Sequence, residues 1–258
     1  MDFTAQHYQQ KPLVIANVWD VPSAQAAQRA GYQAIGTSSA AVAAMLGYPD
    51  GEALPFDALL LIVRRIRAVC SLPLSVDVEA GYATTAEDMT LHLRQLAEMG
   101  VVGINLEDSR VIDGVRKLED PDLFSQRLQA VRTALVFHRC SLFINVRSDA
   151  FLLGLTDALD VTLSRITRYA ACGADGLFIP CVIEAQDIAA LVQHTRLPLN
   201  VMAIPGLSDF TTLAKLGVRR ISMGNALHSA IQHRLNDLLL TVQQQQSFAG
   251  VFNDENYR

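Results

Sequence analysis

One junction recurs along the chain: a helical stretch ends at glycine, and a short apolar run follows with almost no linker. Gly31, Gly100, Gly173 and Gly217 each occupy such a junction. Glycine readily adopts the left-handed conformation that ends a helix, so a strand can begin almost at once. The repeated unit is therefore a strand followed by a helix, which is the βα unit of parallel sheets.

Eight short apolar runs are the candidate strands, at 13–18, 32–38, 73–78, 101–107, 142–147, 176–180, 199–203 and 219–223. Stretches with the period of an amphipathic helix separate them, such as 59–66 and 91–97. Eight strands alternating with helices predict a (β/α)8 barrel of the α/β class, with an open doubly wound sheet as the alternative. Barrels of about 250 residues often form one domain. We therefore expect a single domain over 1–258 that ends in a helical extension at about 226–258.

The composition argues against several classes of partner. The 258 residues carry a formal net charge of -5 without long runs of one sign, so no basic surface for nucleic acid or anionic membranes is expected. The first residues resemble no leader peptide, and no apolar run reaches about 18 residues. We expect a cytoplasmic protein with no nucleic-acid or membrane partner, in which Cys70, Cys140, Cys172 and Cys181 are free thiols.

Three carboxylates stand at the ends of two apolar runs. Asp77 and Glu79 follow the run that begins at 73, and Glu107 follows the run at 101–106. The C-terminal ends of parallel strands open onto one face, where α/β barrels place their chemistry. Because the three are oxygen donors with no His or Cys beside them, they predict a hard ion, Mg²⁺ or Mn²⁺, rather than zinc. A structural role is the alternative for Asp77 and is favoured for Asp108.

Other strand ends supply groups that could bind an anion. Arg147 follows the fifth run, and its planar guanidinium suits a bidentate carboxylate or phosphonate. Ser38 and Ser39 after the second run, with Asn200 on the seventh, could hold the rest of a small anion. The set predicts a pocket for a 2-oxo acid chelated by the metal. The alternative for Arg147 is that it neutralises neighbouring acids.

Two further segments follow these strand ends. The segment 46–52 could bring Asp50 to the mouth as a base or to orient water, although an ordinary Pro-Asp-Gly turn is the favoured interpretation. The segment 109–118 is polar, contains glycine and follows Glu107 directly. A loop in that place can act as a lid.

Taken in order, six segments resemble the isocitrate lyase/phosphoenolpyruvate mutase superfamily, and the match runs from about residue 10 to about residue 240. The segments are Asn-Val-Trp-Asp at 17–20, Gly-Thr-Ser-Ser at 36–39, Leu-Gly-Tyr-Pro-Asp at 46–50, Asp-Val-Glu-Ala-Gly-Tyr at 77–82, Glu-Asp at 107–108 and Asn-Val-Arg-Ser-Asp-Ala-Phe at 145–151. The resemblance implies a (β/α)8 barrel whose last helix is exchanged between subunits, giving homodimers that often pair into homotetramers.

The resemblance also implies roles for individual residues. It implies Mg²⁺, with Mn²⁺ as the alternative, bound partly through water and chelating the 2-oxo-carboxylate of a substrate or product. The matching positions are Asp77, Glu79 and Glu107 for the metal, Ser38 and Ser39 for the substrate carboxylate, Arg147 for the substrate-binding arginine and Asp50 for the catalytic or orienting aspartate.

The chain departs from the superfamily pattern in two places. Glu79 stands where the family commonly has Asp, and the longer side chain would shift the metal or its water shell. Lyases for isocitrate or methylisocitrate carry a Lys-Lys-Cys-Gly-His type motif in the gating loop, whereas 111–118 contains no Cys or His. The Asn, Ser or Thr used there by mutase and phosphonopyruvate hydrolase members are also missing.

These observations lead to one expected activity and two alternatives. We expect a Mg²⁺-dependent carbon–carbon lyase or decarboxylase that acts on a small 2-oxo or 2-hydroxy di- or tricarboxylate through a stabilised enolate. The first alternative is a carbon–phosphorus mutase or hydrolase acting on a phosphonopyruvate-like compound. The second is a catalytically silent protein that binds 2-oxo acids.

Overall fold

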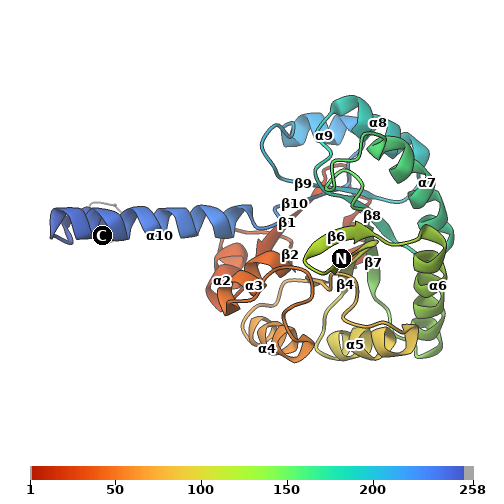
Figure 1. The fold of residues 1–258 in the computed structure, drawn as a ribbon, viewed down its shortest axis with the longest axis horizontal. Helices are drawn as coiled ribbons and strands as arrows, with labels where there is room; N and C mark the ends of the chain where they lie inside the picture. Colours follow the sequence, from red (N-terminus) through yellow and green to blue (C-terminus); the bar gives the residue numbers. More distant parts are fainter. Residues whose placement is uncertain (1, 253–258) are drawn as a thin grey trace.

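The computed structural model describes residues 2–252, in which eight parallel strands close into a barrel (Figure 1). Around the barrel the order is β1-β10-β9-β8-β7-β4-β3-β2, and every neighbouring pair is parallel. The predicted (β/α)8 barrel is confirmed, and each of the eight apolar runs contains one strand. The strands are β1 (Leu13–Val18), β2 (Ala34–Thr37), β3 (Leu74–Asp77), β4 (Gly103–Glu107), β7 (Phe143–Arg147), β8 (Gly176–Ile179), β9 (Leu199–Met202) and β10 (Arg220–Ser222).

Helices follow the strands and surround the barrel (Figure 1). They are α2 (Val21–Arg29), α3 (Ser39–Leu46), α4 (Phe56–Arg67), α5 (Ala86–Glu98), α6 (Pro121–Phe137), α7 (Ala158–Ala171), α8 (Ala185–His194) and α9 (Phe210–Leu216), preceded by the short α1 (Phe3–Gln6). Asp20, Thr85, Asp120 and Asp209 begin four of them by accepting hydrogen bonds from first-turn N–H groups. The four junction glycines all have positive φ, as the left-handed end of a helix requires.

Two elements lie outside the repeated βα units. The segment 109–118 is not an irregular loop but an antiparallel hairpin of β5 (Ser109–Ile112) and β6 (Val115–Leu118). The C-terminal extension consists of α10 (Ala226–Gln245) and the 3₁₀ turn η1 (Ala249–Val251), and α10 points away from the barrel in Figure 1. The part of the predicted extension at 253–258 lies outside the described residues.

The apolar core fills the space between the barrel and the surrounding helices. On α5, Leu93 and Leu96 face the barrel and are fully buried, whereas Leu91 on the other face is 53% exposed. The 3.6-residue period therefore places one leucine face of α5 in the core. None of the helices in the described part of the chain is long and apolar enough to span a membrane.

This packing predicts unequal costs for two leucine truncations on α5. Leu93→Ala should lower the free energy of unfolding by about 2–5 kcal/mol, because it opens a cavity in a packed core. Leu91→Ala, the control on the same helix, should change it by no more than about 0.5–1 kcal/mol. Urea unfolding followed by circular dichroism measures both. Equal losses would show that α5 does not pack through the face described.

Candidate active site at the carboxyl ends of the strands

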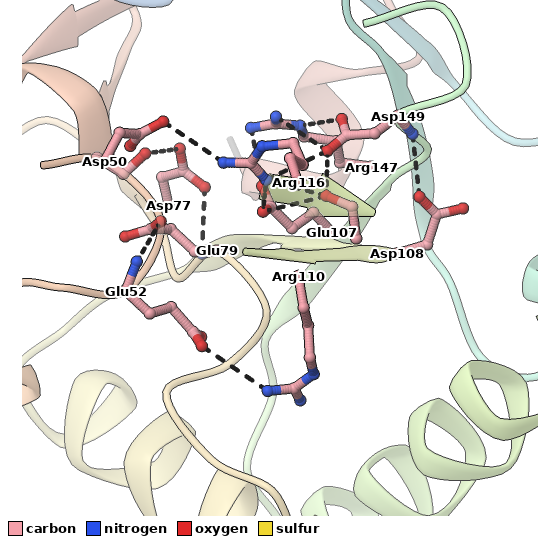
Figure 2. Close-up of polar contacts among 12 residues, drawn as sticks. Asp50, Glu52, Asp77, Glu79, Glu107, Asp108, Arg110, Arg116, Arg147 and Asp149 are labelled. Carbon is pink, nitrogen blue, oxygen red and sulfur yellow. Dashed lines mark hydrogen bonds and ion pairs between the residues drawn. The ribbon is translucent and has the colours of Figure 1, made fainter. Parts of the chain in front are cut away.

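A cavity of about 420 Å³ opens at the carboxyl ends of the barrel strands. Five of the residues predicted for the site line it: Ser38, Ser39, Asp50, Asp77 and Arg147. Glu79 and Glu107 do not line it, but each is only 2% exposed and interacts with residues that do. The structure therefore brings Arg147 and the three carboxylates predicted for the metal together at one mouth (Figure 2).

Asp77 ends β3 and lies at the floor of this cavity. Its backbone N–H donates to Thr37 Oγ1 at 2.8 Å, and its Oδ2 accepts from Ser39 Oγ at 2.9 Å. Burial raises the pKa of Asp77, against the opposing effects of the Arg147 charge and the Ser39 hydrogen bond. A nearby cation stabilises the ionised form of a buried carboxylate such as this one.

Glu79 has an unusual backbone conformation two residues after the end of β3. Its φ of 49° lies in the left-handed region, which costs a residue other than glycine some free energy and is frequent at functional sites. The carboxylate accepts from the Tyr82 hydroxyl at 2.9 Å and from the Glu52 N–H at 2.8 Å. Burial, then the charges of Asp77 and Asp50, raise its pKa to about 7.

Glu107 ends β4 directly opposite Arg147 at the end of β7, because the two residues are partners in the parallel register. Its Oε2 lies 2.9 Å from Arg147 Nη1, and its Oε1 pairs with Arg116. Burial raises the pKa of Glu107, and the two guanidinium groups oppose this effect. Glu107 is thus paired with both of the cations that line the cavity.

Arg147 is held by a second acid as well. Its Nε donates to Asp149 Oδ1 at 2.5 Å, and its Nη2 donates to Asp149 Oδ2 at 3.1 Å. The surrounding carboxylates raise the pKa of Arg147, although burial acts in the opposite direction. The alternative interpretation of Arg147, as a neutraliser of neighbouring acids, therefore holds in this structure while the side chain also lines the cavity.

Asp108 has the structural surroundings favoured for it from the sequence. Its Oδ2 accepts from Arg165 at 3.0 Å, from the Tyr169 hydroxyl at 2.8 Å and from Ser148 at 2.9 Å, while Oδ1 accepts from the Asp149 N–H. Burial raises its pKa, which Arg165 opposes. Through the Asp149 backbone this buried network fixes the residue that orients Arg147.

Arg116 on β6 is a site residue that the sequence interpretation missed. Its Nη1 pairs with Glu107 and donates to Ser109 Oγ at 2.9 Å, and its Nη2 lies 3.5 Å from Asp50 Oδ2. The segment that lacks Cys and His therefore still places a functional group over the cavity (Figure 2). Asp50 lies both in a turn and at the mouth, so its two interpretations are compatible.

Asn200 is the one predicted substrate-binding residue that does not line the cavity. Its side chain is fully buried below it and donates to Val201 O and Ser222 Oγ while accepting from Asn145. These hydrogen bonds occupy its amide among other polar groups inside the barrel. The cavity also receives groups that were not predicted, namely Asn17, Asn105, Leu152, Leu153, Phe178 and Met202.

The donors around the cavity suit a hard divalent cation in chemistry and in charge. Two carboxylates, Asp50 and Asp77, and two cations, Arg116 and Arg147, line it. Directly behind the lining lie three more carboxylates, Glu79, Glu107 and Asp149, and one more cation, Arg220, so the acids outnumber the cations. In the arrangement described for residues 2–252, no three His, Cys, Asp or Glu side chains are grouped as a ligand set. A metal would therefore require Glu79 and Glu107 to turn from their present partners toward Asp77.

The raised pKa of Glu79 predicts how pH affects the stability of metal-free protein. A carboxyl group whose pKa is higher in the folded state favours folding below its unfolded value of 4.5, and this contribution is lost as pH rises to about 7. Stability in EDTA should therefore fall across this window, and less steeply in Glu79→Gln. Urea midpoints at several pH values measure the slope. Glu98→Gln, which changes an exposed carboxylate, is the control, and a wild-type slope in Glu79→Gln would contradict the prediction.

Comparison with known proteins agrees with this architecture. The family model for phosphoenolpyruvate phosphomutase matches residues 3–242. A solved structure from Burkholderia cenocepacia J2315, provisionally named a phosphonomutase, is 37% identical with a TM-score of 0.86, covering 92% of this chain and 97% of that one.

Two enzymes of known name are more distant relatives. The 2-methylisocitrate lyase of Escherichia coli (strain K12) is 28% identical over 92% of this chain and 83% of its own length. An oxaloacetate decarboxylase of Bradyrhizobium sp. (strain BTAi1) is 29% identical over 81% of this chain and 73% of its own length. With the barrel and the ordered strand-end residues, these matches show that the chain belongs to the phosphoenolpyruvate phosphomutase family, within the isocitrate lyase/phosphoenolpyruvate mutase superfamily.

Proposed function

We propose that this protein is a Mg²⁺-dependent carbon–carbon lyase or decarboxylase for a small 2-oxo or 2-hydroxy di- or tricarboxylate. One observation carries the proposal: Arg147 and the acids Asp77 and Glu107 meet at one cavity, at the end of a barrel where such enzymes react. The names of the two enzyme relatives, a lyase and a decarboxylase, support it.

The anion-binding groups of the cavity would hold a carboxylate. Ser38, Ser39 and Ala40 line it at the N-terminus of α3, where the helix dipole and free N–H groups favour negative charge. Arg147 projects into the same space from β7 and is held rigid by Asp149 and Glu107. A guanidinium in a fixed position costs little reorganisation when negative charge develops on the substrate.

The acidic residues would hold the metal and manage protons. Asp77, Glu79 and Glu107 would ligate Mg²⁺ or Mn²⁺, and the bound ion would supply the positive charge that stabilises an enolate. Asp50, 46% exposed at the mouth, is placed to accept a proton from the substrate or to orient water. The apolar side chains of Leu152, Phe178 and Met202 limit water around the reacting carbons.

Carbon–phosphorus chemistry on a phosphonopyruvate-like compound is the second candidate. The 37% identity to the structure provisionally named a phosphonomutase supports it, and an enolate would be common to both reactions. Release of phosphate without carbon–carbon cleavage would favour this candidate. A protein that is stabilised by 2-oxo acids and Mg²⁺ but never consumes them would be the silent binder instead.

Activity assays test the proposal directly. With Mg²⁺, the wild type should release pyruvate or another 2-oxo acid from one of a panel of 2-oxo and 2-hydroxy di- and tricarboxylates. Arg147→Lys should lower kcat/KM about a hundredfold to a thousandfold, the usual cost of removing a preorganised donor. Asp77→Asn should abolish the Mg²⁺ dependence, while the exposed Asp160→Asn serves as the control. Unchanged turnover in Asp77→Asn would refute the proposed metal site.

We also propose that α10 packs on a neighbouring subunit in a homodimer or homotetramer. Only His228 on α10 is buried, whereas Leu227, Ile231, Leu235 and Leu239 repeat every four residues and are 46–60% exposed. A monomer rarely leaves such an apolar stripe in water. Location in the cytoplasm stays a prediction.

The assembly proposal predicts a change of mass in solution. Leu239→Glu should shift light-scattering mass toward the monomer, because a charge buried within an apolar contact is strongly unfavourable. Leu123→Glu, an equally exposed leucine on α6, should leave the mass unchanged. A wild type that is already monomeric would contradict the proposal.

A further inference from the structure

The two terminal nitrogens of Arg116 have different surroundings. Nη1 is occupied by Glu107 Oε1, by Ser109 Oγ at 2.9 Å and by Asp149 Oδ2 at 3.4 Å. Among residues 2–252, the polar contact of Nη2 is a long one of 3.5 Å to Asp50, whose side chain is half exposed. Arg116 also lines the cavity, so Nη1 holds the side chain in place while Nη2 is available to a ligand.

The hairpin directs Arg116 inward by its register. Arg116 pairs with Val111 and Ser109 pairs with Leu118, so these four residues share one face of the hairpin. That face covers the cavity, and Val111 packs against Gly51, where a Cβ would lie 2.4 Å from Val111 Cγ2. Lys117 belongs to the opposite face and is exposed. Only one of the two cations of β6 can therefore reach a ligand.

Arg116 and Arg147 are bridged by two shared carboxylates, Glu107 and Asp149. They bind the two different oxygens of Glu107, and both contact Asp149 Oδ2. Two adjacent cations in one small cavity suit two adjacent negative groups. A short ligand, with one or two carbon atoms between its anionic groups, suits two neighbouring cations of this kind.

We propose that Arg116 is a second anion-binding residue, whose Nη2 holds the negative group on C3 of a short 2-oxo dianion. This inference rests on the proposed function, in which Arg147, Ser38 and Ser39 bind the 2-oxo-carboxylate end of the substrate. Arg116 would then exchange its weak contact with Asp50 for the substrate while Nη1 keeps the hairpin closed. The substrate class becomes a dianion of oxaloacetate or phosphonopyruvate size.

The charge on Arg116 also bears on which bond breaks. A guanidinium stabilises a carboxylate but gives little to neutral CO₂, so it would stabilise the reactant of a decarboxylation more than its transition state. It favours reactions in which the group that leaves C3 keeps its negative charge. Transfer of a phosphoryl group from C3 of a dianion of phosphonopyruvate size meets this condition, because the transferred group keeps its negative charge while the electron pair of the broken bond stays on the enolate.

Binding of matched ligands tests the role of Arg116 without relying on turnover. The probes are 2-oxobutyrate, which has a methyl group at the distal end, and two dianions, oxaloacetate and 3-phosphonopyruvate. Calorimetric titration in the cold with Mg²⁺ gives the dissociation constants for wild type, Arg116→Gln, Arg116→Lys and the control Lys117→Gln. Melting curves establish that each variant is folded.

The wild type should bind at least one dianion more tightly than 2-oxobutyrate. Arg116→Gln should reduce this preference by about tenfold to a hundredfold, which is the loss of a charged hydrogen bond. Arg116→Lys should still neutralise Glu107 but lose part of the preference for dianions. One ammonium group cannot bind both Glu107 and the distal negative group of the ligand as the two guanidinium nitrogens would. Lys117→Gln should behave as wild type. Whichever dianion loses more affinity identifies the distal group as carboxylate or phosphonate.

Two other results have distinct meanings. If the preference persists in both Arg116 variants while all affinities fall together, Arg116 only neutralises Glu107 and the inference is overturned. If the wild type binds 2-oxobutyrate as tightly as the dianions, the inference is also overturned, but a 2-oxo-acid site remains. If the wild type binds none of the three probes, the proposed function itself fails.

Discussion

Buried carboxylates outnumber the cations at the carboxyl end of this barrel, and the rest of the site depends on that imbalance. Parallel strands bring Asp77 and Glu107 to one mouth, where burial raises the pKa of each. Arg147 and Arg116 offset part of the charge through Glu107 and Asp149. The residual negative charge makes the cavity receptive to a divalent cation, and only with added positive charge could it bind a substrate that is itself anionic.

The barrel could be predicted from the sequence because the relevant signals are local. Each junction glycine ends a helix, and each strand, which is buried on both faces, is a nearly continuous apolar run. Both signals can be read from a few adjacent residues. The mouth of the barrel was predictable for a related reason. A residue at the end of a parallel strand, such as Asp77, lies at the mouth of the barrel whatever path the chain takes next.

What the sequence interpretation missed depends on geometry beyond the strand ends. Asp113-Gly114 between apolar residues is a strong hairpin signal, and both residues do have positive φ, yet the segment was interpreted as a loop. Even with the hairpin recognised, its register decides that Arg116 and not Lys117 faces the cavity. Asn200 lies within β9, and its amide is used in hydrogen bonds to Val201 of the same strand, to Ser222 on β10 and to Asn145 on β7, so it does not line the cavity.

The hairpin also makes the cover of the site a separable unit. All four backbone pairings of β5 and β6 lie between its own two strands, and none belongs to the barrel sheet. Its length or sequence can therefore change without altering the register of a single barrel strand. Evolution or protein design could exchange this short segment among barrels that share the acidic mouth, provided that the new hairpin again supplies partners for the buried Glu107 and Asp149.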